Sequence, residues 1–317
     1  MDSLLTALKA VAEPTRLRLL VLCAHADLTV SDLVQILGQS QPRLSRHLKL
    51  LAEAGLLDRS REGSWVYFRL AHAGPTAALG QTLVDALPDQ DPTVLRDLQR
   101  LEELMDERAR RAEDYFRKVA VQWDELRALY VHDDEVERQL ADLIAAEQVT
   151  DLLDIGTGTG RILELLAGKV ERAVGVDLSP DMLMLARSKL ERARLRNCAL
   201  RKGDMHHLPM GDASFDAVTI HQVLHYAERP SQAIREAARV LRPGGRLFIV
   251  DFQAHDLDYL RSEHEHRWLG FEDDKVDDWL HEAGLEPEGC RRLKGKALTI
   301  CIWTARQALA PGRSQAA

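Results

Sequence analysis

The chain has 317 residues, which is long for one domain and sufficient for two, and its 45% hydrophobic and 29% charged composition indicates a globular fold. No apolar run approaches the roughly 20 residues that span a bilayer, and residues 1–14 lack the pattern of a signal peptide, so we expect a cytoplasmic protein without a membrane segment. Four cysteines without CxxC or CxC spacing argue against a disulfide framework.

The net charge of −8 argues against nucleic-acid binding for the chain as a whole, but basic side chains are concentrated in one region. Residues 40–70 contain six Arg or Lys residues against three acidic residues, which gives this region a local charge of +3. A basic patch of this kind binds phosphates even in an acidic protein.

Residues 1–87 are predicted to form short helices followed by one hairpin. A helix begins near Pro14, a second covers 29–38, and a third begins at Ser40 and ends at Gly55. Residues 56–70 then contain two β-rich arms around Glu62 and Gly63, which is a hairpin signal. This order is typical of a winged helix-turn-helix, so we predict a DNA-binding domain over residues 1–87.

The third helix has two chemically distinct faces. Leu44, Leu48 and Leu51 share one face by their spacing, while basic and amide side chains occupy the other. Such a face suits major-groove reading, and the tip of the hairpin suits phosphate or minor-groove contact. A winged-helix module that binds protein is the alternative. The candidate DNA-binding residues are Ser40, Gln41, Arg43, Ser45, Arg46, His47, Lys49, Arg59 and Arg61.

The stretch SQPRLSRHLKLLAEAGLL followed by REGSWVYFRL resembles the recognition helix and wing of the ArsR/SmtB family of repressors. The resemblance implies a homodimer, formed by the N-terminal helix and the helix over about 75–87, that binds palindromic double-stranded operator DNA. Metal-sensing members carry two cysteines where this chain has Thr29 and Ser31. Hydroxyls are poor ligands for soft metals, so we predict no metal site.

Residues 88–114 are predicted to be a helical linker, because a Pro-rich break is followed by a charged stretch without Gly or Pro. Val94, Leu98, Leu101 and Met105 follow a 4-3-4 spacing. Two interpretations remain open: a solvated connector with one packed stripe, or a helix that pairs with a second copy.

Residues 115–306 alternate between short apolar strands and helices, which predicts an α/β Rossmann-like domain with a mostly parallel seven-stranded sheet. Residues 284–293 and 297–306 are expected to form a final hairpin. Residues 307–317 show no pattern and are expected to be a disordered tail.

A glycine-rich turn, DIGTGTG at residues 154–160, follows the first strand of this domain and opens a helix. Glycine allows a sharp turn and close ligand approach, and the helix start offers free N–H groups. Asp154 lies two residues before the first glycine and would repel a pyrophosphate, so it favours a ligand with an ammonium group. Asp177 ends the next strand, where a carboxylate accepts hydrogen bonds from ribose hydroxyls, and Asp204 ends a third strand, where it would accept from an adenine amino group.

With these motifs in order, residues from about 115 to 306 resemble a class I S-adenosylmethionine-dependent methyltransferase. The resemblance implies that Asp154 and Gly156 meet the methionine end of the cofactor, with Gly158 and Gly160 in the same turn. It also implies that Asp177 binds the ribose. It assigns the adenine site to Leu178, Met182, Asp204 and Met205. It assigns the methyl-transfer centre to His221 and Gln222.

Methyl transfer requires a general base only where the acceptor must lose a proton. The candidate general bases are His221 and His225, followed by Asp251 and His255. His264 and His266 lie two residues apart, which does not place them on one helix face, and we expect a solvated helix there instead of a metal site.

Two functions follow from the sequence. The first is a transcriptional regulator of ArsR type whose methyltransferase domain senses S-adenosylmethionine or S-adenosylhomocysteine, with methyl transfer by this domain left open. The second is an active methyltransferase of a small molecule, with the helix-turn-helix serving autoregulation. A regulator needs only a cofactor affinity that differs between the DNA-bound and free states, whereas an enzyme also needs an acceptor site.

Overall fold

The computed structural model describes the backbone of residues 1–62, 65–71, 74–88, 90–127 and 133–309, and all of their side chains except those of 61–62, 65, 109, 111–127 and 133. The chain divides into two compact units, Met1–Ala112 and Glu113–Ala317. The boundary falls within helix α6, Pro92–Arg127. This helix therefore extends well beyond residue 114, where the sequence suggested that the linker ends.

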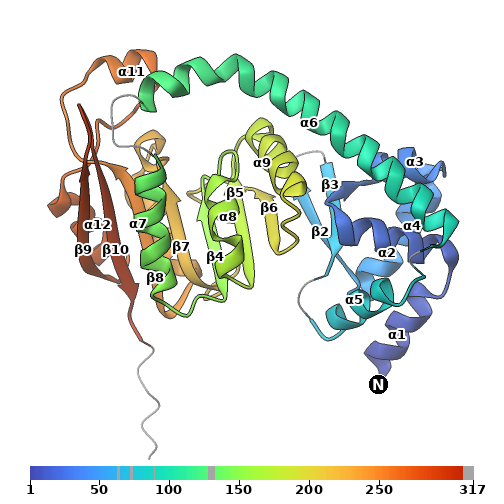
Figure 1. The fold of residues 1–317 in the computed structure, drawn as a ribbon. Helices are drawn as coiled ribbons and strands as arrows, with labels where there is room; N and C mark the ends of the chain where they lie inside the picture. Colours follow the sequence, from blue (N-terminus) through green and yellow to red (C-terminus); the bar gives the residue numbers. More distant parts are fainter. Residues whose placement is uncertain (63–64, 72–73, 89, 128–132, 310–317) are drawn as a thin grey trace, which may run out of the picture. The chain divides into compact units, whose positions relative to one another are not determined.

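The first unit has the predicted order of helices and hairpin (Figure 1). Its three-stranded antiparallel sheet has the order β1-β3-β2. Strand β1 was not predicted, because two residues are too few to show an alternating pattern. The elements before α6 are α1 (Asp2–Val11), α2 (Pro14–His25), β1 (Leu28–Thr29), α3 (Val30–Leu37), α4 (Gln41–Glu53), β2 (Leu57–Glu62), β3 (Trp65–Leu70) and α5 (Ala77–Asp85).

Local sequence signals fix the ends of these helices. Pro14 occupies the first turn of α2, and the Glu13 side chain accepts a hydrogen bond from the Arg16 backbone N–H. Thr29 and Asp32 form a reciprocal capping box at the start of α3. Gly38 ends α3 with a φ of 64°. The hydroxyl at position 29, where metal-sensing relatives carry a cysteine, therefore caps a helix.

The first part of α6 packs on the core of the first unit. Leu101 and Leu104 are buried there, and Leu98 and Met105 are partly buried against the same core. Arg18 makes two hydrogen bonds to the Asp97 carboxylate at 2.5 and 2.7 Å. This is the packed stripe of the first interpretation of the linker, although it uses Leu104, which the 4-3-4 spacing did not include.

Arginines tether the same helix at two further points. The Arg100 guanidinium donates to the backbone carbonyl of Ile36 at 2.8 Å, and Arg108 forms an ion pair with Asp32 at 2.7 Å. Because Asp32 also belongs to the capping box of α3, α6 is tied to the helix-turn-helix itself.

The second unit is an α/β domain built on one seven-stranded sheet. After α6, the described elements are α7 (Asp133–Ala145), β4 (Asp151–Ile155), α8 (Arg161–Leu166), η1 (Ala167–Lys169), β5 (Arg172–Asp177), α9 (Pro180–Arg192), β6 (Cys198–Lys202), β7 (Phe215–His221), η2 (Leu224–Tyr226), α10 (Pro230–Val240), β8 (Leu241–Phe252), α11 (Tyr259–Glu263), α12 (Asp273–Glu282), β9 (Leu285–Lys294) and β10 (Thr299–Gln307).

The strand order is β6-β5-β4-β7-β8-β10-β9. Strands β6, β5, β4, β7 and β8 are parallel to their neighbours, while β10 runs antiparallel to both β8 and β9. The predicted fold class and the final hairpin are therefore confirmed. The order reverses between β4 and β7, and ligands of open α/β sheets bind outside the carboxyl ends of strands at such a point.

Apolar cores cover both faces of this sheet. One core contains side chains of α10 and α12, and the other contains side chains of α7, α8 and α9. Strand β10 continues to Gln307, one residue into the predicted tail, and residues 310–317 of that tail lie outside the described part of the chain. Among the described residues, no helix combines the length and the apolar character that a bilayer crossing requires.

Candidate cofactor and DNA-binding sites

The glycine turn after β4 has a backbone that few other residues would adopt. Gly156, Gly158 and Gly160 have φ values of 68°, 51° and 74°. A Cβ atom at position 156 would lie 2.6 Å from the side chain of Val223, and one at position 160 would lie 3.1 Å from Cβ of Ala186. At position 158 the nearest atom would be 4.0 Å away. The outer two glycines are thus closely packed, whereas the middle one faces open space.

Asp154 is an acid buried at the end of β4, with 1% of its surface exposed. The Thr219 hydroxyl donates to its Oδ1 at 2.7 Å, whereas Oδ2 is buried without a hydrogen-bond partner among the described residues. Burial raises the pKa of Asp154 to about 6, and the nearby Asp177 carboxylate adds to this shift, although the hydroxyl groups of Thr219 and Thr157 oppose it. A cation placed against Oδ2 would satisfy both the oxygen and the charge.

Asp177, the last residue of β5, lies beside the turn. The Gly158 N–H donates to Oδ2 of Asp177 at 2.8 Å, and the Ser179 N–H donates to Oδ1 at 2.8 Å. Each carboxylate oxygen can accept a second hydrogen bond, so the group keeps capacity for a diol. Leu178 is 63% exposed, which is unusual for a large apolar residue, and Met182 is half-buried in the first turn of α9.

Asp204 and Met205 follow β6. The strand ends at Lys202, two residues earlier than predicted, and Asp204 lies in an isolated bridge with His207. Oδ1 of Asp204 accepts from the His206 backbone N–H at 2.9 Å and pairs with the His206 ring at 2.8 Å. These hydrogen bonds lower the pKa of Asp204, so it is ionised at neutral pH. His206 was not singled out by the sequence analysis.

His221 ends β7 at the same edge of the sheet. It pairs with Val250 of β8, while its neighbour Ile220 pairs with Ile155 of β4. Gln222 follows with a φ of 50°, a left-handed conformation that non-glycine residues rarely adopt. Strained backbone of this kind is concentrated at functional sites. The carboxyl ends of β4 and β7 thus bring Asp154 and His221 to one edge.

His225 and Asp251 form a buried pair. The ring Nδ1 of His225 lies 2.7 Å from Oδ1 of Asp251, and the two side chains are 1% and 0% exposed. Asp251 also accepts from the backbone N–H groups of His225 and Phe252, at 3.2 and 2.8 Å. Because the carboxylate only accepts, Nδ1 carries a proton, and in the neutral ring the lone pair is then on Nε2. That Nε2 is buried without a hydrogen-bond partner in the described structure.

The expectation of a solvated helix around His264 and His266 is wrong. Helix α11 ends at Glu263, and His266 is 3% exposed. Its ring centroid lies 4.2 Å from that of His225. Burial lowers the pKa of His266 to about 3 and also lowers the pKa of His255. The segment turns inward because its aromatic rings pack on Phe252, at a centroid distance of 5.7 Å from His266.

Helix α4 of the first unit separates its two faces as predicted. Leu44, Leu48 and Leu51 are fully buried. The exposed candidates on or near α4 are Ser40, Gln41, Arg43, Ser45, Arg46 and Lys49, and Arg59 is exposed on β2. The side chain of Arg61 lies outside the described residues.

His47 differs from the other candidates on α4. Its side chain is 16% exposed, and Nδ1 lies 3.9 Å from the Glu13 carboxylate. Arg43 lies 4.0 Å from the same carboxylate but is 58% exposed. His47 is therefore turned toward the helix bundle, while Arg43 stays available to a ligand in solvent.

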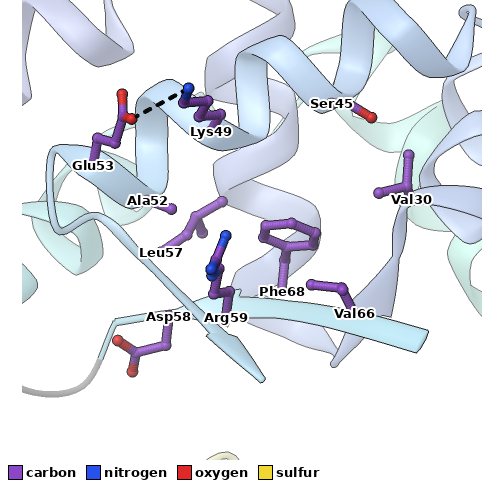
Figure 2. A pocket seen from close by; sticks show the side chains of 10 residues that line it. All are labelled: Val30, Ser45, Lys49, Ala52, Glu53, Leu57, Asp58, Arg59, Val66 and Phe68. Atoms are coloured by element: carbon purple, nitrogen blue, oxygen red, sulfur yellow. Dashed lines mark ion pairs between the residues drawn. The ribbon is translucent and has the colours of Figure 1, made fainter. Parts of the chain in front are cut away.

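A groove of about 570 Å³ runs between α4 and the wing, which is the hairpin of β2 and β3 (Figure 2). Leu57, Val66 and Phe68 give it an apolar side. Its rim is charged, and Lys49 forms an ion pair with Glu53 at 3.7 Å. The other residues that line it are Val30, Ser45, Ala52, Asp58 and Arg59. Three predicted DNA-binding residues from two elements thus meet in one groove.

Comparison with known proteins gives two matches in separate parts of the chain. Residues 13–59 match the family model for bacterial regulatory proteins of the arsR family, and residues 153–249 match the model for a methyltransferase domain.

Individual relatives match parts of the chain. An uncharacterized 37.1 kDa protein in transposon TN4556 of Streptomyces fradiae is 35% identical over 43% of this chain and 41% of its own length. The demethylmenaquinone methyltransferase of Tropheryma whipplei is 32% identical over 43% of this chain and 57% of its own length. The chain thus spans about half the length of the curated relatives it matches.

Solved structures support the fold. A chain from the Haloferax volcanii complex of the Trm112 methyltransferase activator with a methyltransferase aligns with a TM-score of 0.51 at 18% identity, covering 63% of this chain and 99% of that chain. The chain described here therefore joins a helix-turn-helix of the bacterial arsR regulatory family to a methyltransferase domain.

Proposed function

We propose that this chain is a DNA-binding transcriptional regulator of ArsR type whose methyltransferase domain binds S-adenosylmethionine or S-adenosylhomocysteine, and that this ligand changes its affinity for operator DNA. The carrying observation is the Asp154 carboxylate, which is buried with one oxygen that lacks a hydrogen-bond partner in the described structure. Burying a carboxylate with one unpaired oxygen is unfavourable, so this arrangement favours a cationic ligand. The ammonium group of the cofactor's methionine end is such a ligand.

Other residues at this edge suit the rest of the cofactor. Asp177 keeps two lone pairs for the ribose hydroxyls, and exposed Leu178 offers an apolar surface to the adenine ring. Ionised Asp204 accepts a hydrogen bond from the adenine amino group. His221 and Gln222 face the end that carries the methyl group. Together these residues fit the ligand by charge, hydrogen-bonding capacity and apolar surface.

The DNA-reading part of the proposal rests on exposed side chains. Arg43 and Arg46 on α4 read base edges in the major groove, and Lys49 and Arg59 at the groove beside the wing hold phosphates. A homodimer presents two such helices, so the operator is a palindrome.

Helix α6 is the proposed route between ligand and DNA. Its first part is fixed to the helix-turn-helix by Leu101, Arg100 and Arg108, and the same helix continues past residue 112 into the second unit. A ligand changes operator affinity through this helix only if it binds the DNA-bound and the free state with different affinities. The change in operator affinity is then limited by that difference.

The test uses the purified full chain and an operator selected from random DNA. Labelled operator is titrated at fixed salt without ligand, with S-adenosylmethionine and with S-adenosylhomocysteine. We expect the dissociation constant to change by roughly 5- to 150-fold with at least one ligand, which is the usual range of such coupling. Identical curves in all three conditions would refute sensing.

A pair of variants controls this experiment. Gly158→Arg fills the open space in the turn and should remove the ligand response while leaving DNA binding without ligand unchanged. Gly168→Arg makes the same substitution at an exposed glycine with no atom within 4 Å of a new Cβ, and should keep the response. A response that survives Gly158→Arg would mean that the ligand acts elsewhere.

A second function, methyl transfer to a small-molecule acceptor, is favoured by the pair of His225 and Asp251. Asp251 holds the imidazole so that Nε2 presents its lone pair, which is the arrangement of a general base. His225 would take the proton that a hydroxyl or thiol acceptor loses when the methyl group arrives. With methyl-labelled cofactor and small-molecule extract, an acceptor should gain label with the wild-type chain and not with Gly158→Arg.

His225→Gln distinguishes a base from a structural residue. We expect turnover to fall by about 10²–10⁴-fold with unchanged cofactor affinity. If no acceptor gains label beyond the Gly158→Arg background, the enzyme function fails while the sensing function stands.

A further inference from the structure

Three ligand-type side chains meet where helix α12 begins against the final hairpin. Asp273 is the first residue of α12, Cys290 lies on β9, and Cys301 lies on β10. Each offers one ligand atom, and these atoms all lie within 4.8 Å of one another. Within the described ranges of the chain, no second trio of His, Cys, Asp or Glu residues meets this criterion.

The register of the hairpin explains why the thiols meet. Cys290 pairs with Trp303, and Cys301 pairs with Arg292, so the cysteines are diagonal neighbours. Because side chains alternate along a strand, Cys301 projects from the same face as Trp303 and therefore as Cys290. The two Sγ atoms therefore lie within 4.8 Å of each other. Both side chains belong to or pack against the apolar core that contains α12.

Two neighbours hold the carboxylate in place. The Trp303 indole N–H donates to Oδ1 of Asp273 at 2.9 Å, and Arg292 forms an ion pair with Oδ2. The exposed fractions of the Asp273 and Arg292 side chains are 29% and 42%, so water reaches this end of the cluster while Cys301 is fully buried. The Asp273 carboxylate therefore lies at the border between solvent and the buried Cys301 thiol.

We propose that Asp273, Cys290 and Cys301 bind a thiophilic divalent cation of the zinc type. Two thiolates and one carboxylate match the sulfur and oxygen ligands that zinc accepts, and a fourth tetrahedral position stays open to water. Calcium and magnesium prefer all-oxygen sites, so they do not fit this donor set.

Charge supports the same assignment. With a divalent ion bound, the two thiolates and Asp273 contribute three negative charges, which the ion and the Arg292 guanidinium neutralise. Without the ion, two neutral thiols, Asp273 and Arg292 also sum to zero. Binding therefore exchanges one divalent cation for two protons released from the thiols to solvent, and affinity falls as the pH is lowered. The ion would fasten the start of α12 to strand β9 at the edge of the sheet (Figure 1).

The test uses the full chain, freed of metal by a chelator under reducing, oxygen-free conditions and then given zinc alone. After desalting, we expect a single zinc ion per chain by elemental analysis. Cadmium in place of zinc should add a sulfur-to-cadmium charge-transfer absorption to the wild-type chain, which needs no variant. Bound zinc should also raise the melting temperature, because the ion binds only the folded arrangement.

Matched substitutions locate the ion. Cys290→Ser replaces a partly exposed thiol and should abolish both zinc retention and the cadmium band, whereas Cys198→Ser, on strand β6 at the opposite edge of the sheet, should change neither. Asp273→Asn should weaken zinc binding, and Asp274→Asn, at the next and exposed residue, should not.

Three results would overturn the proposal. The first is a wild-type chain that retains no zinc and shows no cadmium band. The second is zinc retention that Cys290→Ser leaves unchanged. The third is a Cys290–Cys301 disulfide that forms on exposure to oxygen in a chain that takes up no metal, which would assign the thiols to redox chemistry.

Discussion

On helix α4, Arg46 and Lys49 are exposed, while Leu44, Leu48 and Leu51 on the opposite face are fully buried. At the carboxyl edge of the seven-stranded sheet the arrangement is reversed: Asp154, His225 and Asp251 are themselves 0–1% exposed. The first unit therefore presents its candidate functional groups to water, and the second withdraws several of its own from water.

This difference decides how each site depends on its surroundings. Exposed charges are already solvated, so they cost little to keep and act through interactions that salt weakens. Buried charges lose their hydration, so they lower stability until a ligand or partner compensates them. Function and stability should therefore be separable on α4 and opposed at the buried acid of the sheet edge. Four substitutions probe these two regions, from the largest expected effect to the smallest.

The largest effect is expected for Gly156→Ala. The new Cβ would lie 2.6 Å from Val223, and the φ of 68° disfavours any side chain. Overpacking costs about 1–3 kcal/mol and the left-handed conformation about 1–2 kcal/mol. The melting temperature of the second unit should therefore fall, and cofactor binding should be lost. Gly158→Ala, with no atom nearer than 4.0 Å, should cost only the conformational part. Equal losses for the two variants would contradict the close packing of the turn.

Asp154→Asn should raise stability at pH 7 while it impairs cofactor binding. The folded-state pKa of about 6 lies above the ordinary value of 3.8, so the folded protein binds more protons between these values and loses stability as the pH rises. The difference between the two pKa values corresponds to a loss of about 3 kcal/mol in folding stability. This loss is complete above pH 6 and absent below about pH 4. Denaturant unfolding of both proteins at pH 7.5 and pH 4 should show a gain for the variant only at the higher pH.

The same substitution separates the function from the stability of this group. An ammonium ligand favours the ionised carboxylate, so wild-type cofactor affinity should fall roughly tenfold per pH unit below about pH 6. The variant should bind weakly at every pH. The pKa of His266 is lowered to about 3, so this residue makes the fold more stable as the pH rises over the same range. Both proteins contain His266, so its effect cancels in the comparison. An Asn variant less stable than the wild type at pH 7.5 would refute the buried-charge argument.

Features that depend on local sequence were predictable. The spacing of Gly156, Gly158 and Gly160 predicted a sharp turn, and the leucine spacing of the third helix predicted its buried face. Each follows from steric limits or periodicity within a few residues. The mostly parallel character of the sheet followed from the alternation of strands and helices, since parallel strands require crossovers, whereas the strand order came only from the structure.

Contacts between distant segments were not predictable. His225 and Asp251 were separate candidates, and only the placement of turn η2 beside the end of β8 brings Nδ1 of His225 to 2.7 Å from Oδ1 of Asp251. Cys290 and Cys301 meet through a hairpin register that their spacing in the sequence does not reveal. His266 had acidic neighbours that suggested solvent exposure, yet packing against His225 and Phe252 buries it. In each case tertiary packing overrides the local pattern.

On the exposed face of α4, Arg46→Ala should weaken operator binding by about 1–3 kcal/mol if the side chain reads a base. The free energy of unfolding should change by no more than about 0.5 kcal/mol. Titrations at several salt concentrations distinguish base reading from phosphate contact, because loss of a phosphate contact lowers the salt dependence and weakens all sequences alike. Arg96→Ala, at an exposed position on α6, is the matched control and should change neither property. A large loss of stability in Arg46→Ala would mean that α4 does not separate its two roles.

The smallest effect is expected for Glu53→Gln at the rim of the groove beside the wing. Glu53 and Lys49 form an ion pair at 3.7 Å, with 61% and 74% of their side chains exposed, and a pair of this kind contributes about 0.3–0.5 kcal/mol. The unfolding free energy should therefore barely change. Operator affinity should rise slightly at low salt, because Lys49 loses its competing carboxylate and the groove loses a negative charge, and the gain should disappear at high salt. Lys49→Gln should shift affinity in the opposite direction with an equally small change in stability. A Glu53→Gln variant that binds operator more weakly would instead give the carboxylate a direct role in reading the DNA, of the kind that acidic side chains play when they accept from cytosine.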